Sequence, residues 1–324
     1  MNSVHCRALR GALAAMQGAG EDARASRCRI PRPRTDERPV PVAACGDARK
    51  PLRPRSVRER PSLEGERMTV VQQLAPMGYF DKTVEHDAVA EVTGASLRYA
   101  DVGSGEPVIL IHGTSLADGV ATPLRHYDPL YDDFRILSYY RAGYSGSVLH
   151  HEGCSIELGA QHIVELLDHV GVDRAHMVAF SAGGVMGLEA LMRYPDRFAT
   201  AVLLEPWLPR EDPIAVEAVN TAGMTAYGKF AEGDLAGAAR YWLEAVGGTS
   251  FLSCIDVYGP KDVWKRVEAD LTPTFYIDAA ALGAWGFTPS KAAEYADRKP
   301  TMPILNVLAH DSEAILPGFR ETFR

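Results

Sequence analysis

Hydrophobic and polar positions follow two alternating patterns from about residue 83 onward. Apolar runs of strand length occur at 96–102, 107–111, 134–139, 176–180, 200–204 and 303–308. Between several of them, apolar residues recur at helical spacing, as in 156–170 and 182–194. Residues 107–111 are apolar throughout, which is typical of a strand buried on both faces of a sheet. The alternation predicts an α/β fold with a mostly parallel sheet and helices on both faces.

A long helical stretch interrupts this alternation between residues 206 and 299. More than 90 residues between consecutive strands are too many for a loop, so we expect a helical cap at about 207–298 inside a domain of 75–324. All four tryptophans lie in this stretch. Its aromatic residues either line a pocket for a medium-sized, mostly apolar small molecule or form the core of the cap itself.

The first 67 residues have a different character. Arg, Pro, Ala and Gly dominate them, and no apolar periodicity lasts more than a turn. Eight acidic residues argue against a transit peptide, and no apolar segment precedes a cleavage site as in a secretory signal. We expect a disordered leader over 1–67, and whether Met68 is the natural start is left open.

The charge and the cysteine content limit the binding partners and the cellular compartment that we expect. Residues 1–67 carry a net charge of +7 and the remainder −15, which together give the chain's −8. An acidic domain repels phosphate backbones and anionic lipid, so nucleic acid and membrane are excluded as partners. The five cysteines have no regular spacing, which favours a reducing cytoplasm. No metal-ligand spacing or phosphate loop is present, so no metal or cofactor is expected, and the oligomeric state is left open.

The strongest chemical signal lies at residues 179–184, Ala-Phe-Ser-Ala-Gly-Gly, between a predicted strand and a predicted helix. A sharp turn there projects Ser181 outward and requires small residues two positions away, here Ala179 and Gly183. The helix N-terminus favours developing negative charge, and the N–H of Ala182 is a candidate oxyanion donor. The alternative is a Gly-rich turn that only packs the helix on the strand or binds phosphate, but the dinucleotide spacing is absent.

This motif resembles the nucleophile elbow of the α/β-hydrolase superfamily, with Ala179 in place of the usual first glycine. Residues 111–114, Ile-His-Gly-Thr, and 141–147, Arg-Ala-Gly-Tyr-Ser-Gly-Ser, resemble two further motifs of that family. The resemblance implies that Thr114 supplies the second oxyanion N–H and that His112 and Gly113 order its loop. A serine nucleophile points to esterase, lactonase, C–C hydrolase or perhydrolase chemistry rather than to the aspartate-dependent members.

Two residues are candidates for the catalytic acid. Asp311 follows the last predicted strand, one position before the residue that matches the family's aspartate, and Glu205 ends the preceding strand. Either could orient a histidine and stabilise its charged form. We favour Asp311 and keep Glu205 open.

The catalytic base is the missing part of the pattern. The resemblance places it after one more helix and strand, but no histidine follows His310. We therefore expect that the chain stops before its last strand and lacks the catalytic histidine, and that it has little activity. The predicted function is a serine hydrolase of an ester, lactone or related carbonyl compound. The alternative is a ligand-binding protein of the same fold with impaired catalysis.

Overall fold

The computed structural model describes residues 85–117, 119, 133–208, 213–259, 261–286, 288–298 and 300–308. All of them belong to one of two compact units, the one comprising Met1–Met16 and Phe80–Arg324. The expected leader at 1–67, Met68, His310 and the candidate acid Asp311 lie outside the described residues.

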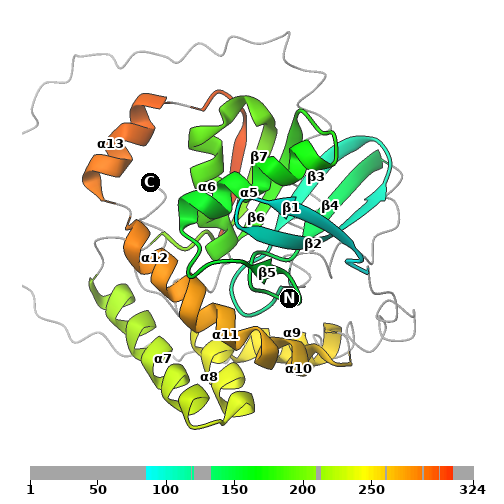
Figure 1. The fold of residues 1–324 in the computed structure, drawn as a ribbon. Helices are drawn as coiled ribbons and strands as arrows, with labels where there is room; N and C mark the ends of the chain where they lie inside the picture. The colour runs from blue at the N-terminus through cyan, green and yellow to red at the C-terminus, as the bar shows by residue number, and fades with distance from the viewer. Residues whose placement is uncertain are drawn as a thin grey trace, which may run out of the picture. The chain divides into compact units, whose positions relative to one another are not determined.

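An eight-stranded sheet forms the core of this unit (Figure 1). Its strands are β1 (Ala88–Val92), β2 (Ala95–Gly103), β3 (Glu106–Ile111), β4 (Phe134–Tyr139), β5 (Val148–Leu149), β6 (Ala175–Phe180), β7 (Phe198–Leu204) and β8 (Ile304–Val307). The spatial order is β1-β2-β4-β3-β6-β7-β8, with β5 paired to β2. The pairs from β4 to β8 are parallel, whereas β2 is antiparallel to β1, β4 and β5. The predicted fold class is confirmed.

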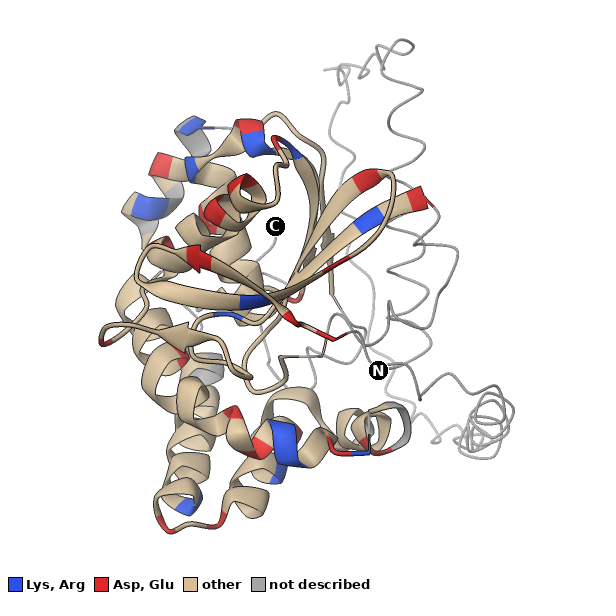
Figure 2. Cartoon of the chain, turned by 45° about the vertical axis from the view of Figure 1, so that its right-hand side comes forward, with Lys and Arg blue, Asp and Glu red and all other residues tan. Residues whose placement is uncertain are grey.

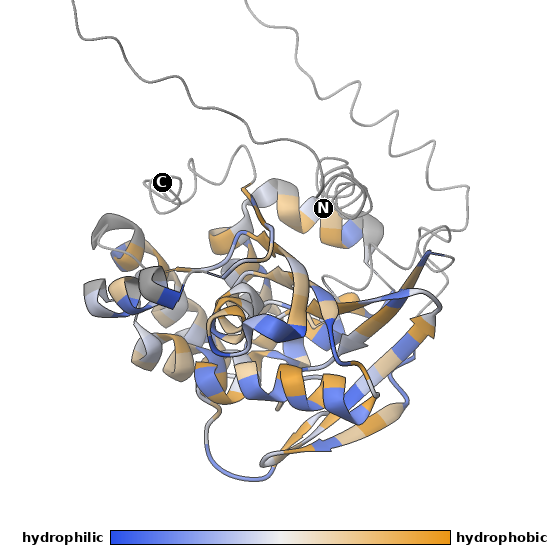
Figure 3. Cartoon of the chain, turned by 90° about the horizontal axis from the view of Figure 1, so that it is seen from above, coloured by the Kyte–Doolittle hydropathy of each residue, from blue (hydrophilic) through white to orange (hydrophobic). Residues whose placement is uncertain are grey.

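Helices α5 (Ile156–His169) and α6 (Ala182–Arg193) pack against each other and bury their apolar faces in the main core. Ser155 begins α5 because its side chain accepts a hydrogen bond from the N–H of Leu158 at 3.1 Å. A short 3₁₀ turn, η2 (Pro195–Arg197), leads into β7. Apolar and hydrophilic residues are mixed along the described helices (Figure 3), as amphipathic helices require.

The described residues between β7 and β8 are helical wherever they form regular structure. The elements are α7 (Pro213–Ala231), α8 (Leu235–Gly247), α9 (Thr249–Tyr258), α10 (Val263–Ala269), α11 (Leu271–Pro273), the π-helical η3 (Thr274–Asp278), α12 (Ala279–Trp285) and α13 (Pro289–Arg298). Trp242 and Trp264 pack in a separate hydrophobic cluster of this insertion, whereas Trp207 and Trp285 pack on the main core. Two of these tryptophans therefore help to hold the helical insertion together, and the other two pack it against the main core.

Charged residues of both signs are interspersed over the described ribbon (Figure 2). Within the described ranges, no helix has the length and hydropathy that a membrane span needs. In the same part of the chain, no three His, Cys, Asp or Glu side chains converge as metal ligands.

Candidate active site

Ser181 occupies the turn between the end of β6 and the start of α6. Its backbone has φ 51° and ψ −121°, a conformation that costs a residue with a side chain about 1–3 kcal/mol. Two hydrogen bonds hold the Ser181 backbone in this conformation. The N–H of Ser181 donates to Leu204 O at 2.9 Å, and its carbonyl oxygen accepts from Gly184 N at 2.9 Å. The strained turn is thus built into the sheet and the helix, which is the geometry the sequence motif predicts.

Small residues allow two backbone segments, the loop after β3 and the Ser181 turn, to meet closely. A Cβ added to Gly183 would lie 2.2 Å from His112 O, and one added to Gly113 would lie 3.0 Å from Ser181 Cβ. The loop after β3 therefore rests directly against the Ser181 turn. Ala179, the small residue on the other side, is fully buried.

His112 orders the loop after β3 through both of its ring nitrogens. Its Nδ1 donates to Gly113 O at 2.7 Å, and its Nε2 accepts from the N–H of Arg141 at 2.9 Å. Since an amide N–H can only donate, this arrangement fixes the tautomer with the proton on Nδ1. Burial, and then the charge of Arg141, hold the pKa of His112 well below its usual value. The ring is neutral and has no free nitrogen with which to deprotonate Ser181.

Arg141 is a buried cation that connects the loop after β3 to the helical insertion. Its guanidinium donates to His112 O at 3.1 Å and to Gly113 O at 3.0 Å. It also forms a two-pronged ion pair with Asp278 of η3, at 2.8 and 2.6 Å. Burial by itself would lower the pKa of Arg141, but the carboxylate of Asp278 raises it overall. The pair is almost fully shielded from solvent, with side-chain exposures of 4% and 2%.

Two backbone N–H groups are available near the turn. Ala182 is the first residue of α6, so its N–H has no acceptor within its own helix. The N–H of Thr114 belongs to the peptide group whose carbonyl, Gly113 O, is taken by His112 and Arg141. In a planar trans peptide the N–H points away from the carbonyl, so that of Thr114 points away from Arg141.

Glu205 lies at the same edge of the sheet as Ser181. Phe180 of β6 pairs with Leu204 of β7, so the residues that follow them, Ser181 and Glu205, leave adjacent strand ends. Glu205 has φ 45°, and its N–H donates to Val307 O at 2.9 Å. The topology therefore brings Glu205 to the turn, whereas Asp311 lies outside the described residues.

Four described histidines other than His112 form hydrogen bonds elsewhere in the fold. Their partners are Ser138 for His86, Ser96 for His150, Thr93 O for His162, and Thr200 with Glu106 for His176. Among the described residues, no hydrogen bond joins a histidine to Ser181. A base for this serine is thus not shown.

A second buried carboxylate, Glu189, fixes the helix that follows Ser181. Glu189 accepts hydrogen bonds from Trp285 Nε1 at 2.8 Å, from Arg193 Nε at 2.5 Å and from the hydroxyl of Tyr295. Burial alone would raise its pKa, but these donors lower it overall. Glu189 was not predicted, although an acid within the apolar run of 182–192 was a visible signal. Arg141 was treated only as a mark of the fold, and Asp278 was not identified.

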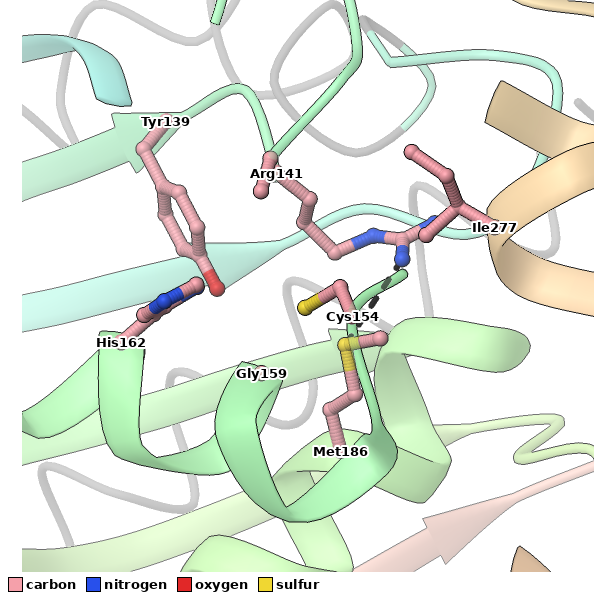
Figure 4. A pocket seen from close by; sticks show the side chains of 8 residues that line it. Tyr139, Arg141, Cys154, Gly159, His162, Met186 and Ile277 are labelled. Carbon is pink, nitrogen blue, oxygen red and sulfur yellow. Dashed lines mark hydrogen bonds between the residues drawn. The ribbon is translucent and has the colours of Figure 1, made fainter. Parts of the chain in front are cut away.

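A small cavity lies beside Arg141, between α5, α6 and η3 (Figure 4). It offers only about 10 Å³ to the centre of a water-sized sphere, which is room for about one water molecule. Its lining residues are Tyr139, Arg141, Ala142, Cys154, Gly159, His162, Met186 and Ile277. Burial raises the pKa of the Cys154 thiol to about 11, so this thiol is protonated and unreactive near neutral pH. The cavity is too small for an organic substrate.

Known proteins resemble the chain in both sequence and fold. An uncharacterized hydrolase of Bacillus subtilis, YcgS, is 27% identical over 132 residues, which are 37% of this chain and 42% of that protein. The 2-hydroxy-6-oxo-6-phenylhexa-2,4-dienoate hydrolase of Comamonas testosteroni is 31% identical over 114 residues, which are 34% and 40% of the two chains. The match thus spans less than half the length of these curated relatives.

The structure of a bromoperoxidase from Bacillus anthracis superposes with a TM-score of 0.50 at 20% identity, covering 72% of this chain and 84% of that one. At this identity the likeness speaks for the fold alone. The sequence model of the α/β hydrolase fold family matches residues 106–318, well over half of the chain. The chain therefore belongs to the α/β hydrolase fold family.

Proposed function

We propose that this protein is a serine hydrolase that acts on an ester, lactone or related carbonyl compound, with Ser181 as nucleophile. The observation that carries the proposal is the strained backbone of Ser181, φ 51° and ψ −121°, at the N-terminus of α6 and against the loop of His112. Strain of this kind persists where function requires it. The Ser181 hydroxyl attacks the carbonyl carbon, and the N–H groups of Ala182 and Thr114 bind the oxyanion.

The rest of the triad is an acid and a histidine. Asp311 or Glu205 orients the imidazole, and the position of Glu205 beside the Ser181 turn supports the second choice. Serine is a weak nucleophile without a base. Both ring nitrogens of His112 are engaged, by Gly113 O and by the N–H of Arg141, so the base of the triad we propose is a histidine other than His112.

The substrate we propose is a medium-sized, mostly apolar small molecule. Leu116, two residues beyond Thr114, packs against the hydrophobic cluster of the cap that includes Phe230 and Phe275. Apolar rings thus adjoin the loop that would hold the oxyanion. A phenyl-substituted dienoate, named in the substrate of the Comamonas testosteroni relative, is a compound of this kind.

A second function is favoured by one observation, that no described histidine hydrogen-bonds to Ser181. It is binding of such a small molecule without turnover. The two functions differ in whether Ser181 becomes covalently modified.

Labelling with a fluorophosphonate tests the proposal. We expect modification of Ser181 in the purified polypeptide, because a fluorophosphonate reacts with an activated serine. Peptide mass spectrometry locates the adduct. Ser145→Ala is the matched control, because Ser145 also has a positive φ, 44°, but does not begin a helix; this variant should label like the wild type. An unmodified Ser181 would favour the binding protein.

A further inference from the structure

The orientation of one peptide group decides where the Thr114 N–H points. The carbonyl of this group, Gly113 O, accepts from His112 Nδ1 at 2.7 Å and from Arg141 Nη2 at 3.0 Å. Because the group is planar, fixing the carbonyl fixes the direction of the N–H on its other side. Donors on a carbonyl also polarise the amide and strengthen its N–H as a donor. The oxyanion contact thus depends on the placement of Arg141.

Arg141 is itself held from the cap. Both terminal nitrogens of its guanidinium donate to the two oxygens of Asp278, in the parallel arrangement that fixes the plane of the fork. In the part of the chain that the structure describes, Asp278 is the only carboxylate that accepts from Arg141. Figure 4 shows the Arg141 side chain reaching from the loop after β4 toward the cap segment that carries Ile277, the neighbour of Asp278.

A second set of hydrogen bonds also connects the η3 segment to the loop that carries Thr114. The hydroxyl of Tyr144 donates to Asp278 Oδ2 at 2.6 Å and is hydrogen-bonded with Thr114 Oγ1 at 3.2 Å. Thr274, one turn before Asp278 in η3, bonds with Ser115 Oγ at 2.8 Å. Ser115 is fully buried and has φ 60°. The η3 segment therefore contacts the loop directly at Ser115 and is linked to Gly113 O through Arg141.

We propose that Asp278 is a positioning residue for the oxyanion donor, so that seating the cap on the core sets the direction of the Thr114 N–H. Asp278 acts through Arg141 and Tyr144 and does not touch the substrate. The catalytic role of the Thr114 N–H rests on the proposed function. The structural link between Asp278 and the Gly113–Thr114 peptide does not.

Selective isotope labelling with NMR reports on the Gly113–Thr114 peptide group and does not require catalytic turnover. The sequence contains two Gly-Thr pairs, 113–114 and 248–249. With ¹³C-carbonyl glycine and ¹⁵N threonine, a carbonyl-to-amide correlation spectrum of the full chain shows these two peaks alone. Gly248 lies between α8 and α9 in the cap and serves as the internal control.

Asp278→Asn should move the Gly113–Thr114 peak and leave the Gly248–Thr249 peak in place, because the hydrogen bond from Arg141 to Gly113 O is weakened. The matched control is Asp270→Asn. Asp270 is also a buried carboxylate of the helical insertion, but it accepts hydrogen bonds from the backbone nitrogens of Ser145, at 3.1 Å, and Ala117, at 3.4 Å. In this variant the first peak should stay near its wild-type position. An unmoved peak in folded Asp278→Asn overturns the proposal.

Tyr144→Phe is a second variant, which tests the proposal if Asp278→Asn does not fold. It removes one donor to Asp278 and should move the same peak in the same direction by a smaller amount; no movement overturns the proposal. In ester turnover, Asp278→Asn should lower kcat about ten- to hundredfold with KM within about twofold, since an oxyanion donor acts in the transition state. If Ser181→Ala retains full turnover, the proposed function fails, while the peak shift still decides the link from Asp278.

Discussion

Replacing Arg141 with methionine is expected to lower the free energy of unfolding by about 3–5 kcal/mol, because Asp278 would remain buried without its charged partner. The carboxylate is 2% exposed and would keep only the hydroxyl of Tyr144 among these donors. Urea unfolding followed by circular dichroism measures the loss.

Two further variants show whether the effect belongs to the buried pair. Removing both charges in Arg141→Met/Asp278→Leu should recover most of the lost stability, since an apolar pair leaves no unpaired charge. Arg135→Met breaks another two-pronged pair, with Asp101 at 2.6 Å, whose side chains are each 30% exposed. Solvent screens that pair, so its loss should cost less than about 1 kcal/mol. Equal losses in Arg141→Met and Arg135→Met would contradict the buried role of Arg141.

Gly183→Ala is expected to cost about 3 kcal/mol and to abolish labelling of Ser181. The added methyl group would lie 2.2 Å from the backbone oxygen of His112, so α6 or the loop of His112 has to move. Thermal unfolding and fluorophosphonate labelling measure the two effects.

Gly228→Ala is the control for this substitution. Gly228 lies in α7, and an added Cβ there meets nothing within 4 Å. Alanine should stabilise that helix by about 0.5–1 kcal/mol and leave labelling unchanged. If Gly183→Ala behaved like Gly228→Ala, the close approach of the two segments would be wrong.

The sequence predicted the fold because its signals are local. The apolar run at 107–111 and the motif at 179–184 have the strand and strand–turn–helix patterns that the structure contains. The reversal of direction at β2 was not predicted, because pairing direction depends on contacts between strands that are distant in sequence. The π-helical turn of η3 has no sequence signal of comparable strength.

The candidate site was predictable only in part. The motif picked out Ser181, which directly follows β6, and the resemblance picked out His112 and Thr114 in the loop after β3. Asp278 was out of reach, because its role comes from Arg141, a residue 137 positions away. A charged residue in a helical stretch indicates a solvent-exposed helix face, unless it is known which distant residue of the fold forms an ion pair with it.

A crystal structure of the polypeptide with an arylboronic acid tests the central claim most directly, because boron forms a tetrahedral, anionic adduct with an activated serine. The account predicts a bond from boron to Ser181 Oγ, with one boronate oxygen about 2.7–3.1 Å from the backbone nitrogens of both Ala182 and Thr114. An unmodified Ser181, or an adduct whose oxygens point away from those two N–H groups, would contradict it.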